Sequence, residues 1–234
     1  MIELRETLWE TGLLGKRSYK LVLSDDVSSD ELEKFFSIEI PRGFVSCRIP
    51  ASRIDLASIL EKNNFCFVEP YLILEKNLNP IDVRRCVRVA SSSDIPELRE
   101  IAGKSFSVTR FHADPNIDNS IADKSRAEWV ANALGDSNKD VYVFESENRI
   151  VSFMVFKKIN SETGSIDLIA THPDFRSKGF GSGLLREVEQ IVHKNGVKIL
   201  EVGTQGSNTG SLNFYMREGF RVSRAYITFH LHKF

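Results

Sequence analysis

The sequence predicts an α/β protein in two parts, a small N-terminal α/β domain followed by a larger α/β domain. The chain has 234 residues, enough for one large domain or two small ones. Strand-like and helix-like apolar spacings are mixed along its whole length. The turn-rich stretch Asn77-Leu78-Asn79-Pro80 is the best break, so we expect domains over 1–80 and 85–234.

Composition and charge exclude several classes of protein. Hydrophobic residues make up 41% and charged residues 27% of the chain, which excludes a fibrous or wholly disordered protein. The 31 basic and 32 acidic residues give a net charge of −1, so the whole chain is not attracted to nucleic acid or anionic lipid. The N-terminus has no apolar signal region, and no apolar run is long enough to span a bilayer. We therefore expect a cytoplasmic protein without membrane insertion.

The N-terminal part should alternate strands and helices. We expect strands over 19–23, 43–49 and 65–74, with Pro70 marking an edge or a bulge in the third. Ser28 and Glu31 have capping-box spacing and open a helix that ends near residue 36. The stretch 52–55 repeats a capping signal before a second helix.

The C-terminal part begins with a strand over 86–90 and a helix with Asp94 as N-cap. After an irregular stretch and a helix through Trp129, a hairpin and a strand–loop–helix–strand unit follow. The expected ranges after the irregular stretch 107–119 are strands 141–145, 150–159, 165–170 and 198–202, helices 179–194 and 208–218, and a closing strand 226–232.

The loop Arg176-Ser177-Lys178-Gly179-Phe180-Gly181 carries the clearest chemical signal. It lies between a strand and a helix, where glycine lets the backbone approach a ligand and helix N–H groups favour phosphate. Arg176 and Lys178 add positive charge, so we expect a pyrophosphate site. A Walker loop is excluded because its Gly-Lys-Ser/Thr ending is absent, and position 184 is Leu where the dinucleotide fingerprint needs Gly. The alternative is a glycine-capped helix that binds no ligand.

Three motifs in order identify a family. Ile169-Ala170-Thr171-His172-Pro173-Asp174-Phe175 followed by Arg-x-x-Gly-x-Gly resembles the acyl-CoA motif of the GCN5-related N-acetyltransferase (GNAT) family. Asn208 and Tyr215, seven residues apart, resemble its second signature, and the stretch 87–96 resembles its first strand and helix. This resemblance, over residues 85–234, implies an acetyl-CoA-dependent N-acetyltransferase. It also implies the GNAT fold, a mixed, mostly antiparallel twisted sheet flanked by helices.

The resemblance implies residue roles as well. The backbone of Ile169, Ala170 and Thr171 would bind the pantetheine arm and polarise the acetyl carbonyl. Asn208 would bond the pantetheine, or cap its helix, or both. Tyr215 would protonate the departing thiolate, the alternative being a residue packed on the sheet. The residues expected to hold the pyrophosphate are Arg176, Ser177, Lys178, Gly179, Phe180, Gly181 and Ser182.

A catalytic base is harder to find. Glu201 is the candidate, because some members of the family place a carboxylate on the corresponding strand; the alternative is a solvated or ion-paired residue. His112 and His172 are weaker candidates. An amine with a pKa near 8 would also lose its proton to water without a strong base.

The N-terminal part and the loop 107–119 suggest the acceptor. Arg110, Phe111 and His112 offer a phosphate partner, a stacking face and hydrogen-bonding groups, although Arg110 could instead pair with a carboxylate while Phe111 closes the core. The whole-chain layout resembles the nucleotide-sugar acetyltransferases of this family. We therefore expect the amine of a dTDP-linked amino-deoxy sugar to be the acceptor, in polysaccharide (O-antigen) biosynthesis. The arginines expected to make the mouth basic are Arg84, Arg85, Arg88 and Arg110.

Two other functions stay open at this point. The acceptor could be a protein N-terminus, a polyamine or an antibiotic, or the chain could be a non-catalytic acyl-CoA-binding module. No metal is expected: Cys47, Cys66 and Cys86 form no Cys-x-x-Cys pair and read as small buried residues. His230 and His232 have a metal-like spacing, but no third ligand is evident. An exposed closing strand could pair across a homodimer.

Overall fold

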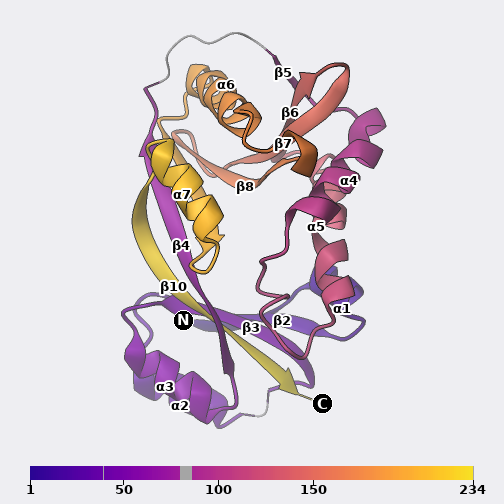
Figure 1. Ribbon diagram of the computed structural model, residues 1–234. Coiled ribbons are helices and arrows are strands. Elements are labelled where there is room, and N and C mark those ends of the chain that lie inside the picture. The colour runs from indigo at the N-terminus through magenta and orange to yellow at the C-terminus, as the bar shows by residue number, and fades with distance from the viewer. Residues whose placement is uncertain (39, 80–85, 234) are drawn as a thin grey trace.

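The computed structural model describes residues 1–38, 40–79 and 86–233, and one sheet runs through them (Figure 1). The strand order is β1-β2-β3-β10-β4-β9-β8-β7-β6-β5. The strands are β1 (Ile2–Glu6), β2 (Ser18–Leu23), β3 (Gly43–Pro50), β4 (Cys66–Asn77), β5 (Val87–Val89), β6 (Lys139–Ser146), β7 (Arg149–Lys158), β8 (Thr163–Thr171), β9 (Ile199–Gln205) and β10 (Arg221–Lys233). The α-helices are α1 (Leu8–Leu14), α2 (Ser29–Phe36), α3 (Ile54–Lys62), α4 (Ile95–Ser105), α5 (Asn119–Ala133), α6 (Phe180–Lys194) and α7 (Thr209–Arg217), and short 3-10 helices span Ser92–Asp94 and Pro173–Phe175.

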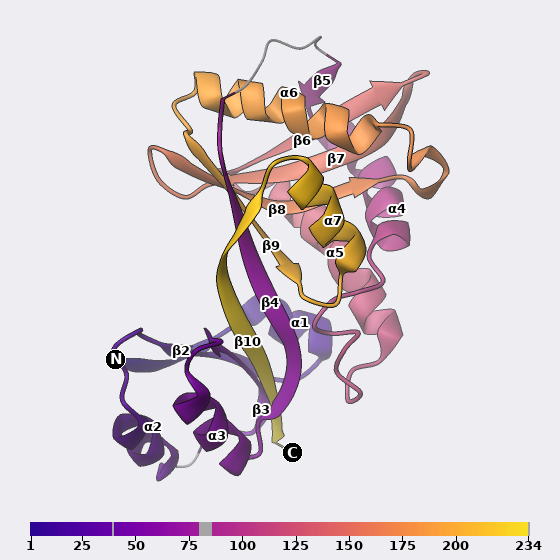
Figure 2. The same cartoon turned by 60° about the vertical axis from the view of Figure 1, so that its left-hand side comes forward.

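The long strands β4 and β10 join the two ends of the molecule (Figure 2). β10 comes from the C-terminal segment but lies between β3 and β4 of the N-terminal segment. The prediction that the closing strand is free to pair across a dimer is therefore wrong. The expected division at residues 80–85 lies outside the described residues and stays a prediction.

The N-terminal strands are covered on one face by α2 and α3. The capping box is confirmed: Ser28 Oγ accepts a hydrogen bond from the Glu31 N–H, and Glu31 Oε2 accepts one from the Ser28 N–H. α3 follows Arg53 without a side-chain cap, so the second predicted capping signal is not used. Strand β1 and helix α1 were not predicted. The core under α2 and α3 contains Leu21, Leu32, Ile49, Leu56, Leu60 and Phe229.

Pro70 lies where β4 loses its second neighbour, because β4 pairs with β10 at this residue but its ladder with β9 begins only at Tyr71. The edge interpretation agrees with this position, since the proline nitrogen has no strand to donate to on that side. The bulge interpretation agrees with a register shift close to Pro70, where Glu69 pairs with Thr228 and Phe67 with Phe229. The Pro70 carbonyl accepts a hydrogen bond from the Gly206 N–H at 2.8 Å, so the residue also fixes the turn after β9.

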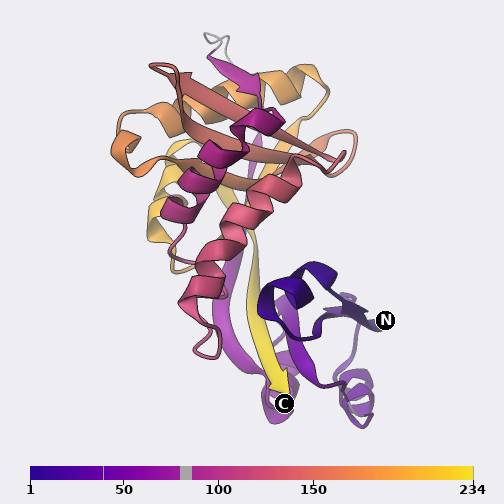
Figure 3. The same cartoon turned by 90° about the vertical axis from the view of Figure 1, so that its right-hand side faces the viewer.

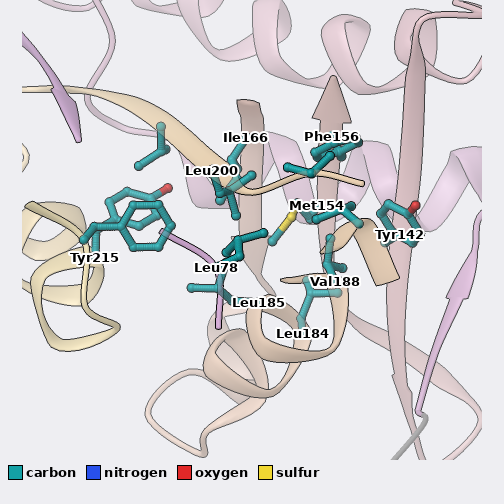
Figure 4. Packing of buried hydrophobic residues seen from close by; sticks show 14 of the residues in the cluster. Leu78, Tyr142, Met154, Phe156, Ile166, Leu184, Leu185, Val188, Leu200 and Tyr215 are labelled. Atoms are coloured by element: carbon teal, nitrogen blue, oxygen red, sulfur yellow. The ribbon is translucent and has the colours of Figure 1, made fainter. Parts of the chain in front are cut away.

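The C-terminal strands are covered on both faces. Helices α4 and α5 lie on one face (Figure 3), and α6 and α7 lie on the other. Figure 4 shows the core under α6 and α7, where Met154, Leu184, Leu185 and Tyr215 pack together. The predicted β6–β7 hairpin is confirmed, with Glu147 and Asn148 at φ 53° and 58° in its tight turn.

The structure also tests the predictions made for the cysteines and for membrane-spanning segments. Cys47 is buried as expected, but Cys66 and Cys86 are exposed, so the prediction of three buried cysteines is wrong for two of them. Among the described residues, no helix is both long enough and apolar enough to cross a membrane.

Candidate active site

Strands β8 and β9 pair in parallel for only part of their length. Their ladder runs from Thr163 and Ile199 to Ile166 and Val202 and then ends. On the other side of β8, the register with β7 shifts between Ile166 and Leu168, which marks a bulge. Beyond this point the two strands separate, so backbone N–H and C=O groups of β8 face a gap instead of a partner strand. Ile169, predicted to bind the pantetheine, lies on this stretch and lines a cavity.

The predicted phosphate loop leads into the N-terminus of α6. Gly179 is the N-cap residue at φ 86°, a left-handed conformation that favours glycine, and no side chain caps the helix. The first N–H groups of the helix therefore have no intrahelical or capping partner. Arg176 and Lys178 are exposed, and their side chains donate hydrogen bonds to the Thr171 and Asp174 carbonyls.

The three predicted cofactor-binding segments meet at one place. A Cβ added to Gly181 would lie 3.1 Å from Thr171 Oγ1 at the end of β8 and 3.8 Å from the Phe214 ring on α7. Glycine at this position lets the start of α6 approach both elements closely. The predicted residues Phe180 and Ser182 lie on the same first turn of α6, and Ala170 is buried beside Thr171. Their role in binding a pyrophosphate or pantetheine stays a prediction.

Asn208 and Tyr215 both line the cavity. Asn208 is the N-cap of α7, where its Oδ1 accepts a hydrogen bond from the Ser211 N–H at 3.1 Å. Tyr215 lies two turns later and is 5% exposed, with its ring packed against Phe214 and Phe220. Burial, assisted by the nearby Tyr71, raises the pKa of the Tyr215 phenol. The hydroxyl therefore stays protonated at neutral pH and can donate a proton.

The cavity has a volume of about 440 Å³, within the range of small-molecule sites. One end lies between the separated strands β8 and β9, beside Asn208 and Tyr215. The other end is walled by residues of β2, β3, β4, α1 and α5 and by the loop before α5. The N-terminal segment therefore completes the site that the C-terminal segment begins.

The predicted acceptor residues are only partly brought together. Arg110 and Phe111 line the cavity, and the Arg110 guanidinium lies 4.5 Å from the Phe111 ring centroid. Arg110 also pairs with the Glu10 carboxylate of α1. His112 does not line the cavity: its Nε2 contacts Asp123 at 3.0 Å.

The basic wall of the cavity consists largely of residues that the sequence did not single out. Arg48 of β3, Arg126 of α5 and Lys20 of β2 line it with Arg110. Arg88, expected at the mouth, instead pairs with Asp94 and Glu145. Arg84 and Arg85 lie outside the described residues. No local motif marks Arg48 and Arg126, because strands and a helix distant in sequence bring them together.

Two carboxylates on the cavity wall differ in environment. Glu201, the predicted base, forms an ion pair with Arg224 at 2.8 Å, and its role stays a prediction. Glu69 of β4 is 3% exposed, and within the described residues its Oε1 has no hydrogen-bond partner. Burial raises the pKa of Glu69, an effect that Arg48 opposes. The sequence signal that could have singled it out is its position in the predicted strand 65–74, where all the other residues are apolar.

The two histidines of the closing strand have a third partner that the sequence did not reveal. One oxygen of the buried Asp114 carboxylate lies 2.6 Å from His230 Nδ1 and 2.7 Å from His232 Nε2. These atoms are of the kind that ligate metals, but their spacing suits hydrogen bonds, and Lys16 Nζ lies 3.1 Å from His232 Nδ1. The cluster anchors the loop carrying Arg110 to β10.

Comparison with known proteins decides the family. The profile described as the acetyltransferase (GNAT) family matches residues 95–220, more than half of the chain. The chain belongs to the GNAT family of acetyltransferases. A solved GCN5-related N-acetyltransferase from Sphaerobacter thermophilus matches with a TM-score of 0.62 and 14% identity, over 92% of this chain and 72% of that one. The predicted GNAT fold is therefore confirmed.

Two curated relatives extend over most of this GNAT protein. It is 27% identical over 189 residues to dTDP-fucosamine acetyltransferase from Escherichia coli, covering 80% of this chain and 81% of that one. It is 22% identical over 236 residues to spore coat polysaccharide biosynthesis protein SpsD from Bacillus subtilis, covering 97% and 81%. The protein is an N-acetyltransferase of a family that uses acetyl-CoA, as predicted.

Proposed function

We propose that this enzyme transfers the acetyl group of acetyl-CoA to the amine of a dTDP-linked amino-deoxy sugar, as a step in polysaccharide biosynthesis. The observation that carries the proposal is the cavity, which is continuous from the separated strands to a basic wall built by both segments, with Lys20 and Arg48 from one and Arg110 and Arg126 from the other. A sugar nucleotide has an amine at one end and a diphosphate further along, so it matches both ends. The names of the two relatives support the same substrate class.

In the proposed reaction, the thioester lies between β8 and β9. The backbone around Ile169 to Thr171 stabilises the oxyanion, and Asn208 orients the pantetheine arm. The pyrophosphate lies on the helix N-terminus formed by the loop from Arg176 to Ser182. The neutral amine attacks the acetyl carbonyl carbon, the carbon–sulfur bond breaks, and the thiolate takes the hydroxyl proton of Tyr215.

The amine must also lose a proton, and Glu69 is the better placed of the two carboxylates to accept it. Its Oε1 is buried on the cavity wall and has no partner among the described residues, whereas Glu201 is held by Arg224. We expect Glu69→Gln to lower kcat/KM and flatten the acidic limb of its pH profile, while Glu201→Gln keeps that limb. The opposite pattern would assign the base to Glu201.

The alternative acceptors fit the cavity less well. A polyamine carries several positive charges and would be repelled by Lys20, Arg48, Arg110 and Arg126. A non-catalytic acyl-CoA-binding module would have no use for a protonated phenol such as Tyr215 in the cavity. Both observations favour an enzyme with an anionic acceptor.

A CoA-release assay tests the proposal. Acetyl-CoA is supplied with dTDP-linked 4-amino or 3-amino sugars, spermidine or a short peptide, using wild type and Tyr215→Phe. We expect turnover with a dTDP-linked amino sugar and its near-complete loss in the variant. Turnover with the peptide or spermidine alone would contradict the proposed acceptor and leave the N-acetyltransferase assignment standing.

A further inference from the structure

The basic end of the cavity has more positive than negative charge. Four cationic side chains line it, together with the Glu10 carboxylate. The Glu69 carboxylate lies between this end and the acetyl end, because Thr228 separates it from Arg48 and it is two residues from Tyr71, where β4 meets β9. The other two acidic lining residues, Asp167 and Glu201, pair with Lys139 and Arg224, which do not line the cavity. If all these groups are charged, four cations against two carboxylates leave two positive charges. Holding such charges away from water is unfavourable without counter-charges. The four cationic side chains at this end of the cavity are Lys20, Arg48, Arg110 and Arg126.

Strand register places one of these cations firmly. Arg48, Thr228 and Glu69 are neighbours across β3, β10 and β4. Arg48 Nε donates to Thr228 Oγ1 at 3.1 Å, and its guanidinium lies 3.5 Å from the Tyr71 ring centroid. Burial lowers the pKa of Arg48, with Arg110 adding to the effect. Because the sheet fixes this side chain, it forms a pre-organised floor for an anion.

Arg126 of α5 lies against aromatic rings. Its guanidinium lies 5.6 Å from the Phe106 ring centroid and 5.1 Å from that of Trp129. Its Nε is buried and has no hydrogen-bond partner within the described residues, and the same holds for Trp129 Nε1. Burial and the neighbouring Arg110 lower the pKa of Arg126 to about 10, so it is still charged at neutral pH. Two buried donors on one helix, three residues apart, therefore lack an acceptor.

We propose that Arg48, Arg110 and Arg126, with the Trp129 N–H, bind the diphosphate of the acceptor. This inference rests on the proposed function, which it deepens by assigning the part of the substrate that β3, α5 and the loop before α5 recognise together. A nucleotide diphosphate sugar carries about two negative charges, which matches the two excess positive charges at this end of the cavity. The guanidinium group of arginine can donate two parallel hydrogen bonds to phosphate oxygens. The loop from Arg176 to Ser182 does not line the cavity, so this anion site is distinct from the one proposed for CoA.

Calorimetric titration tests the assignment. Enzyme saturated with CoA is titrated with dTDP, thymidine or inorganic pyrophosphate, using wild type, Arg126→Gln and Arg99→Gln. Arg99 is the matched control, because it pairs with Glu128 at the surface and does not line the cavity. We expect dTDP to bind at least roughly tenfold more tightly than thymidine, and Arg126→Gln to lose that advantage. Arg99→Gln should bind dTDP like wild type.

The companion kinetics show whether the variants are folded. Arg126→Gln should raise KM for the amino-sugar nucleotide and leave KM for acetyl-CoA unchanged. If Arg126→Gln does not fold, Trp129→Phe removes one unpaired donor while keeping the ring packing, and should weaken dTDP binding in the same direction. If inorganic pyrophosphate binds as tightly as dTDP, the nucleoside adds no affinity and the phosphates alone account for binding. This result supports the assignment.

The failures of the two proposals are distinguishable. Equal binding of dTDP and thymidine, or equal dTDP binding by Arg126→Gln and Arg99→Gln, overturns the diphosphate site. If dTDP binds through Arg126 but no sugar nucleotide is acetylated, the anion site stands and the proposed substrate is wrong. If a sugar nucleotide is acetylated equally well by wild type and Arg126→Gln, the proposed function stands and this site is wrong.

Discussion

Oδ2 of Asp114 lies 2.6 Å from Nδ1 of His230, which is 116 residues further along the chain. The same oxygen lies 2.7 Å from His232 Nε2, so a single carboxylate joins the loop before α5 to the closing strand. Because Arg110 is on that loop, the contact also positions part of the basic wall.

Asp114→Asn should destabilise the protein substantially. An amide carries no negative charge, so the oxygen of Asn is a weaker hydrogen-bond acceptor than the carboxylate for the buried His230 and the partly buried His232. We expect the free energy of unfolding, measured in urea at neutral pH, to fall by about 2 kcal/mol. Asp123→Asn is the control: Asp123 contacts His112 with a 58% exposed side chain, so its loss should cost under about 1 kcal/mol. Equal losses in the two variants would contradict the anchoring role of Asp114.

Acid should destabilise the fold through His230. Burial lowers the pKa of His230 from 6.5 to about 4, despite the opposing hydrogen bond to Asp114. Between these values the unfolded chain binds the proton and the folded chain does not, so stability falls as pH drops from 6.5 toward 4. The pKa of Asp114 is also below its usual value, which adds a loss only at lower pH.

Urea unfolding at pH 7 and pH 5 measures this effect. The free energy of unfolding should fall by up to about 1.4 kcal/mol per pH unit from this histidine. His230→Asn has no titrating ring and should show a shallower fall. An identical slope in both proteins would assign the acid sensitivity to other groups.

Tyr215→Phe should remove activity and leave the fold intact. The ring keeps its contacts with Phe214 and Phe220, but the proton donor for the thiolate is lost. We expect kcat to fall by about 10²-fold or more, with a near-wild-type melting temperature. Tyr142→Phe is the control, since Tyr142 is equally buried but does not line the cavity. If both variants keep kcat within about threefold of wild type, Tyr215 is not the acid.

Gly179→Ala should weaken the binding of acetyl-CoA. A Cβ at this position would meet nothing, but φ is 86°, where a side chain strains the backbone by about 1 kcal/mol. The turn that presents the α6 N–H groups would relax, and KM for acetyl-CoA should rise. Gly103→Ala on α4, where the space is also open and φ is not positive, should be neutral or stabilising. A KM that is equally unaffected in both variants would remove the loop from the cofactor site.

Local signals were sufficient for many helices and turns in both parts of the chain. Cap and turn residues such as Ser28 with Glu31, or Glu147 with Asn148, act within a few positions and can be recognised in the sequence. The strand β1 was missed because its apolar alternation covers only Ile2 to Arg5, and the helix α1 because seven residues are too few to show a helical apolar period. The central position of β10 was missed because pairing with β3 and β4 is a long-range choice that no local pattern expresses.

The same division holds for the site. The cofactor segments were predictable, because a loop and a helix start present their chemistry in contiguous residues. The acceptor end of the cavity could not be predicted. Its residues Arg48, Glu69 and Arg126 come from two strands and a helix that are distant in sequence, and only the fold brings them together. Arg88 was predicted to make the mouth of the site basic, but in the structure it pairs with the carboxylates of Asp94 and Glu145.

A competition reaction tests the central claim most directly. Equal concentrations of a dTDP-linked 4-amino sugar and spermidine are incubated with limiting acetyl-CoA and wild-type enzyme, and the acetylated products are quantified by mass spectrometry. We predict that almost all of the acetyl groups are found on the sugar nucleotide, because the basic wall admits its diphosphate and repels a polycation. Acetylation mainly of spermidine would contradict the account.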